Sequence, residues 1–143
     1  MKLHPVPAPA VEPRLLPLYL SRVAAGFPSP ADDYIEAQLD LNTHLVRHPA
    51  ATFIARAEGH SMTGLGIFDG DLLIVDRSLQ AQHGMIVIAA LDGELTCKVL
   101  DTRRKRLLSG NEQYPPIPIP EDSALVIEGV VTHSIRHHHV CPG

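Results

Sequence analysis

The sequence predicts a mainly β fold, a compact and twisted all-β body that follows an extended N-terminal arm. From Thr52 onwards, short runs of β-branched and apolar residues alternate with turn residues, a pattern typical of strands. Asp92-Gly93 separates two of these runs and is a strong hairpin signal. No helix is expected between the runs, so we expect strands at 52–57, 72–75, 85–90, 95–100, 106–109 and 125–132.

The expected N-terminal arm is rich in proline. The first 30 residues hold seven of the thirteen prolines, so this segment is not expected to pack as a regular element. Its apolar part, residues 15–25, is expected to add a short helix or strand against the body. Residues 32–45 are loosely helical, with Asp32 as a candidate N-cap, although Leu41-Asn42 could instead begin a turn. Residues 115–120 are expected to form an extended surface segment, because proline donates nothing to a β-ladder.

Composition narrows the class of protein. A chain of 143 residues suits one compact domain with an arm or tail. The net charge of -4 argues against a surface built mainly for nucleic acid. Cys97 and Cys141 show no disulfide or metal spacing, which fits a reducing cytoplasm. No apolar stretch approaches the ~20 residues of a membrane span, and prolines interrupt any signal peptide.

One stretch, Gly59 to Asp76, carries the candidate nucleophile. Ser61 lies in a glycine-bounded turn, and Asp69-Gly70-Asp71 is a second turn signal that leads into the apolar run 72–75. A hydroxyl held on a bend beside a rigid sheet is a plausible nucleophile, but it needs a base.

Lys98 is a candidate for that base. If residues 94–100 form a strand, Thr96 and Lys98 share one face, and apolar neighbours would desolvate the lysine and disfavour its ammonium form. A base at neutral pH needs its pKa lowered by roughly 3 units, about 4–5 kcal/mol. Thr96 would orient the amine through a hydrogen bond. The alternative is an edge-strand lysine that discourages aggregation.

Other groups offer competing chemistry. A Ser-His-Asp triad could use one of four histidines, and spacing selects none of them; these are His44, His48, His83 and His133. His60 adjoins Ser61 and should project elsewhere. Residues 137–139 with Cys141 could bind a soft metal, although a solvated tail is the simpler interpretation. Residues 103–106 could touch phosphate, but a solvated hairpin loop is expected there.

Several motifs together resemble the LexA-type family of self-cleaving serine peptidases. They are Gly59-His60-Ser61-Met62, the run from Asp69 to Asp76, and the run from Asp92 to Lys98. Residues 26–36 and Asp40-Leu41-Asn42 resemble the UmuD-like branch, whose members are accessory subunits of an error-prone DNA polymerase. The similarity extends from about Gly26 to Ile135, most of the chain.

The resemblance implies a LexA-like peptidase body and a Ser-Lys dyad without metal or cofactor. Ser61 would be the nucleophile and Lys98 the neutral general base. The main-chain amides of His60 and Ser61 would form the oxyanion hole. The bond cleaved would be Ala25–Gly26. Residues 1–25 would then be the arm that self-cleavage removes, 26–50 a linker, 51–136 the catalytic and dimerisation domain, and 137–143 a flexible tail.

The resemblance also implies partners. The chain would form a homodimer, would be stimulated to cleave by the RecA filament on single-stranded DNA, and would join a UmuC-type polymerase for translesion synthesis in the SOS response. Direct sequence-specific DNA binding is not expected. The proline-rich start, the His-rich tail and His60 depart from the family pattern.

Three other functions remain open at this stage. A LexA-like repressor is disfavoured because about 25 residues before the cut cannot hold a helix-turn-helix domain. A signal-peptidase-like enzyme would need a membrane anchor. A non-catalytic interaction module would carry Ser61 and Lys98 only by coincidence.

Overall fold

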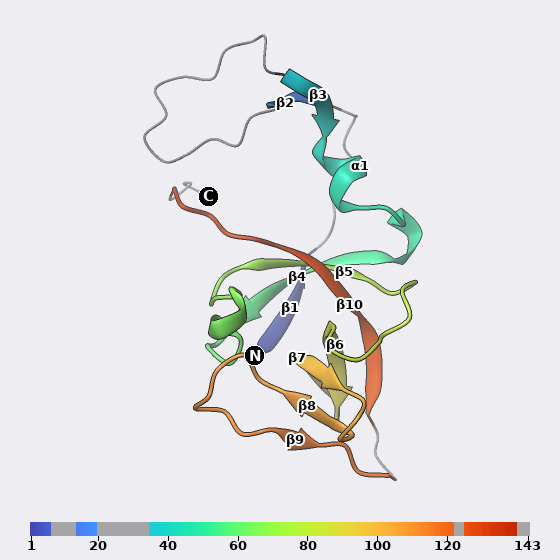
Figure 1. The fold of residues 1–143 in the computed structure, drawn as a ribbon, viewed down its shortest axis with the longest axis vertical. Helices are drawn as coiled ribbons and strands as arrows, with labels where there is room; N and C mark the ends of the chain where they lie inside the picture. The colour runs from blue at the N-terminus through green and yellow to red at the C-terminus, as the bar shows by residue number, and fades with distance from the viewer. Residues whose placement is uncertain (7–13, 20–34, 122–124, 140–143) are drawn as a thin grey trace. The chain divides into compact units, whose positions relative to one another are not determined.

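A computed structural model describes residues 1–6, 14–19, 35–121 and 125–139 (Figure 1). The expected cleavage site at Ala25–Gly26 and the candidate cap Asp32 lie outside these residues. The chain divides into two compact units, one formed by Met1–Ala8 with His48–Gly143 and the other by Pro9–Arg47.

The larger unit is built on one antiparallel sheet. Its strand order is β1-β4-β5-β10-β6-β7-β8-β9, and β1 also pairs with β7. The six strands from β1 to β7 in this order therefore form a closed ring. Outside the ring, β8 pairs with β7 and β9 pairs with β8. The strands are β1 (Lys2–Val6), β4 (Thr52–Glu58), β5 (Leu72–Asp76), β6 (Ile86–Leu91), β7 (Glu94–Asp101), β8 (Arg106–Leu108), β9 (Ile117–Pro118) and β10 (Val126–Ile135).

The predicted mainly β body is confirmed, and each of the six expected runs contains a strand. The β6–β7 hairpin turns at Asp92-Gly93, where both residues have positive φ, 51° and 83°. A two-residue turn with two positive φ angles is the type that matches the twist of its flanking strands. This local preference explains why the hairpin could be predicted from sequence.

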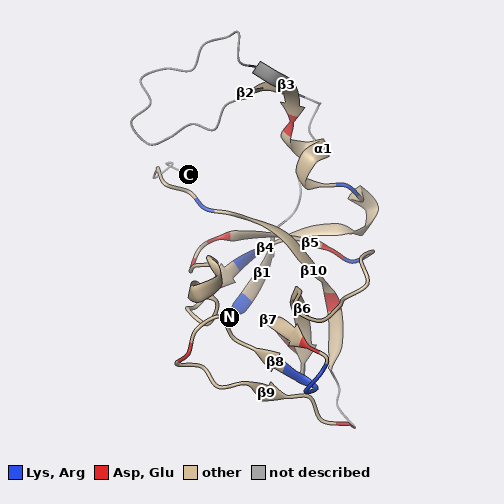
Figure 2. Ribbon diagram, in the orientation of Figure 1, with Lys and Arg blue, Asp and Glu red and all other residues tan. Residues whose placement is uncertain are grey.

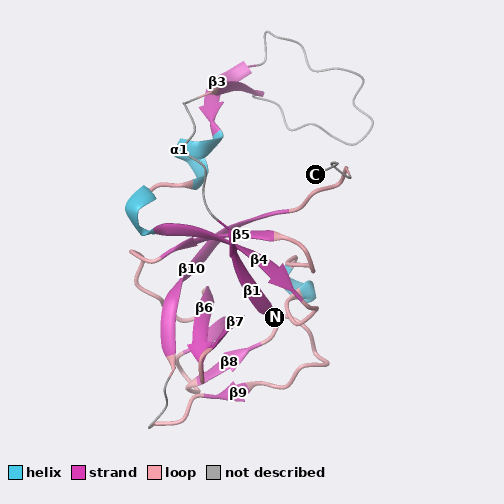
Figure 3. Cartoon of the chain, turned by 180° about the vertical axis from the view of Figure 1, so that it is seen from behind, coloured by secondary structure: helices cyan, strands magenta, loops and turns pink. Residues whose placement is uncertain are grey.

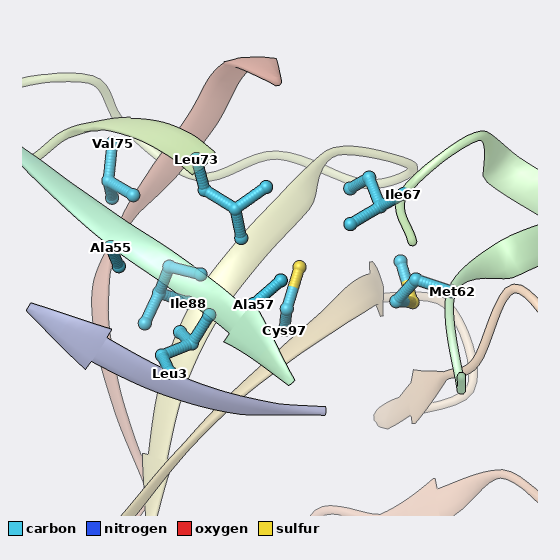
Figure 4. Packing of buried hydrophobic residues seen from close by; sticks show 9 residues of the cluster. All are labelled: Leu3, Ala55, Ala57, Met62, Ile67, Leu73, Val75, Ile88 and Cys97. Carbon is cyan, nitrogen blue, oxygen red and sulfur yellow. The ribbon is translucent and has the colours of Figure 1, made fainter. Parts of the chain in front are cut away.

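The inner face of the ring holds an apolar cluster (Figure 4). Alternate residues of β4, Ala55 and Ala57, point inward and are nearly fully buried, as expected for a strand with one covered face. The other members are Leu3, Met62, Ile67, Leu73, Val75, Ile88 and Cys97. A second cluster is formed by residues of β6, β7, β8 and β10, which are Val87, Ala89, Leu100, Leu107 and Val130.

The expectation that the arm would form no regular element is wrong. Residues Lys2–Val6 form β1, which pairs antiparallel with β4 along its full length, from Lys2 opposite Glu58 to Val6 opposite Ile54. Pro5 lies within this strand opposite Ala55. Proline removes one donor from a strand but keeps an extended backbone, so a short strand tolerates it. Burial of Leu3 in the apolar cluster fixes this pairing.

The smaller unit corrects the helix expected over residues 32–45. Residues Ile35–Asp40 form β3, which pairs antiparallel with β2 (Leu15–Tyr19), and within the described part of this range only Leu41–Leu45 is helical, as α1. Asp40 caps α1 by accepting a hydrogen bond from the main-chain nitrogen of Asn42 at 3.1 Å. The strand alternative proposed for the apolar part of the arm is confirmed at Leu15–Tyr19.

The basic run lies in a hairpin, as expected, whereas the proline-rich segment is extended as expected but also pairs with the sheet. Ile117–Pro118 is extended and pairs with β8 at the outer edge of the sheet. The basic residues 103–106 span the β7–β8 hairpin, whose turn residues are exposed. Basic and acidic residues are scattered over the described ribbon, most of which is neither (Figure 2). None of the helices in the described part of the chain has the length and apolar character that a bilayer crossing requires.

Candidate active site

Ser61 lies in the turn that follows β4, and a neighbouring loop holds that turn in place. The main-chain nitrogen of Gly110 donates to the carbonyl of Ser61 at 2.7 Å, and the nitrogen of Gly64 donates back to the carbonyl of Gly110. The side-chain amide of Asn111 donates to the carbonyl of His60 at 3.0 Å. Ser61 is only 1% exposed. Its hydroxyl is therefore presented by a turn with a fixed backbone.

Lys98 projects from β7 toward this turn. Its Nζ donates to Ser61 Oγ at 2.8 Å and to the carbonyl of Cys97 at 3.2 Å, and the side chain is 4% exposed. The two residues that the sequence singled out are therefore in direct contact, although 37 positions separate them. The edge-strand interpretation of Lys98 is wrong, since the amine is buried and hydrogen-bonded.

Burial sets the protonation of this site. It lowers the pKa of Lys98 from its ordinary value, because the ammonium loses water that the protein does not fully replace. Burial, followed by the charge of Lys98, lowers the pKa of the Met1 α-amine to about 6. The adjacent Cys97 thiol has a pKa raised by burial to about 12, so it stays protonated and unreactive. Burial thus shifts both amines that contact Ser61 Oγ toward their neutral forms.

The α-amine of Met1 is a component that the sequence did not indicate. It donates to Ser61 Oγ at 3.0 Å and to Thr96 Oγ1 at 3.4 Å. Thr96 was expected to orient Lys98. In the described part of the chain, the Thr96 hydroxyl accepts from the α-amine of Met1, and the carbonyl of Cys97 is the second acceptor for Lys98. An orienting role for Thr96 stays a prediction.

Two histidine–carboxylate pairs were compared with the contacts of Ser61 because a Ser-His-Asp triad was an alternative to the Ser-Lys pair. His48 Nδ1 lies 2.6 Å from a carboxylate oxygen of Asp76, and His83 Nδ1 lies 3.5 Å from one of Asp101. The Ser61 hydroxyl is instead contacted by the amines of Lys98 and Met1. The structure therefore favours a serine–lysine arrangement over a triad built on His48 or His83.

The loop after the serine turn is anchored by Arg136, which follows β10. Its guanidinium donates to both carboxylate oxygens of Asp71, at 3.3 and 3.2 Å, and to the carbonyl of Gly66 at 2.7 Å. It also stacks 3.8 Å from the centre of the Phe68 ring. A planar guanidinium matches this combination of carboxylate and ring, which an ammonium cannot reproduce.

Replacing Arg136 with alanine is expected to lower the free energy of unfolding by about 1–3 kcal/mol, because buried Asp71 would lose a charged donor. Arg136→Lys should recover only part of this loss. Urea unfolding of the three proteins measures the difference. Equal stability of all three would show that Arg136 does not anchor this loop.

Sequence reasoning also missed Gly110 and Asn111. Ser109-Gly110-Asn111 carries a turn signal, but nothing local indicates that this turn contacts residues 60–64. Only the folded chain brings the two segments together.

Comparison with known proteins identifies the family. The model of the Peptidase S24-like family matches residues 17–132. The chain belongs to the Peptidase S24-like family. MucA of Salmonella typhimurium is 48% identical over 128 residues, 88% of each chain, and ImpA of the same organism is 49% identical over 120 residues, 84% of this chain and 83% of ImpA. The LexA repressor of Ectopseudomonas mendocina is 39% identical over 133 residues, 91% of this chain and 64% of the repressor.

These matches confirm the resemblance found in the sequence. Members of the S24 family are self-cleaving serine peptidases, and MucA, ImpA and SamA are UmuD homologues. The chain is a UmuD-like, self-cleaving serine peptidase of SOS mutagenesis, where it works with a polymerase. Its greater similarity to MucA and ImpA than to the LexA repressor disfavours the repressor alternative.

Proposed function

We propose that Ser61 is the nucleophile and Lys98 the general base of a reaction that cleaves the chain's own Ala25–Gly26 bond. The observation that carries this proposal is the 2.8 Å contact between Lys98 Nζ and Ser61 Oγ in a buried setting. A serine hydroxyl becomes an effective nucleophile only beside a base. A desolvated lysine supplies one without histidine.

The reaction has two halves. Neutral Lys98 takes the proton from Ser61 Oγ while this oxygen attacks the carbonyl carbon of Ala25. The main-chain amides of His60 and Ser61 stabilise the resulting oxyanion. Lys98, now an ammonium, gives its proton to the nitrogen of Gly26, which leaves as an amine, and Ala25 stays esterified to Ser61. Water, deprotonated by Lys98, then hydrolyses this ester and restores the serine.

Self-cleavage divides the chain into functional parts. Residues 1–25 are the arm that is removed, 26–50 a linker, 51–136 the catalytic and dimerisation domain, and 137–143 a tail. Gly26 suits the position after the cut, because the absence of a side chain lets the backbone approach Ser61 closely.

We also propose specific partners, which the similarity to the UmuD homologues supports. The protein acts as a homodimer, the RecA filament on single-stranded DNA stimulates its cleavage, and the shortened dimer joins a UmuC-type polymerase. The relatives MucA, ImpA and SamA support this set of partners through their similarity along most of the chain.

Mass spectrometry tests the proposal. We expect purified protein held at about pH 9 to yield two fragments, one that ends at Ala25 and one that begins at Gly26, because a lysine of lowered pKa is neutral more often at this pH than at pH 7. Ser61→Ala should remain intact under the same conditions. Cleavage at another bond, or equal cleavage of the Ser61→Ala protein, would contradict the assignment.

A further inference from the structure

The strand β1 closes the ring of strands at the candidate active site. The described pairings join β4 to β5 and β1, and β1 in turn reaches β7 through Lys2 opposite Thr96. In both views of the chain, β1 lies between β4 and β7 (Figures 1 and 3). Ser61 follows β4, and Lys98 lies on β7. The place that β1 fills between β4 and β7 is called the seam below, and the candidate active site lies along it.

The seam holds β1 as an extended strand. β1 adds to the edge of β4 over five consecutive residue pairs, the arrangement by which many proteins bind extended peptides. Leu3 provides the buried anchor, since it is 7% exposed and packs in the cluster with Ala57 and Ile88 (Figure 4). On the outer side, His4 Nε2 lies 2.7 Å from a Glu58 carboxylate oxygen.

The start of β1 occupies the position expected of the residue after a scissile bond. The main-chain nitrogen of Met1 lies 3.0 Å from Ser61 Oγ, where the nitrogen of that residue would lie, and the strand runs away from Ser61 in the direction of the residues that follow it. Aligning Gly26 with Met1 gives Pro30 the place of Pro5 and Pro28 the place of Leu3. Counted from Gly26 as position 1, Pro28 and Pro30 fall at odd positions. The proline of β1 is also at an odd position, counted from Met1.

We infer that β1 is an exchangeable strand. It occupies the position beside β4 in which the cleavage segment must bind, and it inhibits self-cleavage until it dissociates. This inference rests on the proposed function of Ser61 and Lys98. Two strands cannot pair with the same edge of β4, so each molecule with β1 in place excludes the segment after Ala25. Stimulation of cleavage must then include release of residues 1–6.

Leu3→Asp tests the inference in the full chain. A carboxylate in the apolar cluster should expel β1, and unassisted cleavage should accelerate about tenfold or more, because the rate follows the fraction of molecules with an open seam. Val126→Asp is the matched control, since Val126 is 53% exposed on β10 and outside the seam. A synthetic peptide of residues 1–6 should slow the Leu3→Asp protein again, and the same peptide with aspartate at position 3 should not.

A second variant tests the inference in the case that Leu3→Asp does not fold. A chain that lacks residues 2–6 removes β1 without burying a charge, and it should also cleave faster than the wild type. Thermal unfolding of both variants reports whether the body is intact. The inference is wrong if both variants cleave at or below the wild-type rate, whether they are folded or not, because β1 would then be a fixed part of the body.

Hydrogen exchange separates this inference from the proposed reaction. In the Ser61→Ala protein, which should not cleave, the amides of β1 should be protected, and a synthetic peptide of residues 20–31 should remove that protection. Unchanged protection would overturn the inference even if the wild type cleaves itself. Loss of protection would support it even if Ser61 proved not to be the nucleophile.

Discussion

Replacing Lys98 with alanine is expected to abolish self-cleavage while the protein remains folded. Nζ is the side-chain donor that contacts the nucleophile at 2.8 Å, and loss of a general base slows a reaction by about 10²–10⁴-fold. Ser61→Ala should have at least the same effect, because no acyl intermediate can form. Intact mass after incubation at alkaline pH measures both variants.

Lys98→Arg distinguishes a base from a positive charge. The guanidinium keeps its proton at all accessible pH values, so this variant should be as inactive as Lys98→Ala. Lys105→Ala, in the exposed β7–β8 turn, is the matched control and should cleave like the wild type. Cleavage by Lys98→Arg at a rate near the wild type would show that Lys98 acts through its charge and not as a base.

Gly64→Ala is expected to disable the site from a position that touches neither reacting group. A Cβ at position 64 would collide with the carbonyl oxygen of Gly110, and this loop holds the carbonyl of Ser61. The resulting shift should reduce cleavage by about 10²-fold if Ser61 moves by about 1 Å. Overpacking should also cost about 1–3 kcal/mol of stability.

Gly129→Ala provides the comparison. A Cβ there would lie 2.6 Å from Cγ1 of Val75, so it should cause a similar loss of stability on β10, away from the serine turn. Cleavage rates and urea midpoints of the two variants separate the effects. If the two variants lost cleavage to the same extent at equal stability, the Gly64–Gly110 contact would have no special role in positioning Ser61.

Local sequence preferences account for the part of the fold that was predicted. The strands of the body combine β-branched runs with turns such as Asp92-Gly93, and both signals act within a few residues. The smaller unit depends on a distant partner instead. Residues 35–40 have a loosely helical pattern but pair with β2, some 20 residues earlier in the chain, and such pairing overrides weak propensity.

The dyad could be predicted because a recognisable motif surrounds each member, Gly59 to Met62 for Ser61 and Asp92 to Lys98 for the lysine. The presence of β1 beside the dyad could not be predicted from the sequence. The prolines of the arm predict an irregular chain, whereas Leu3 gains enough from burial against Ala57 and Ile88 to hold residues 2–6 as a strand. The contact of Gly110 with Ser61 is equally non-local and left no trace in the sequence.

The pH dependence of unassisted self-cleavage tests the central claim most directly. Burial lowers the pKa of Lys98, so raising the pH increases the neutral fraction of the base. The Met1 amine, with a pKa of about 6, is already largely neutral above about pH 7 and adds little to the change. We expect the wild-type rate to rise between about pH 7 and about pH 10 and to level off once Lys98 is neutral. A rate that stays flat across this range would contradict the role of Lys98 as the base.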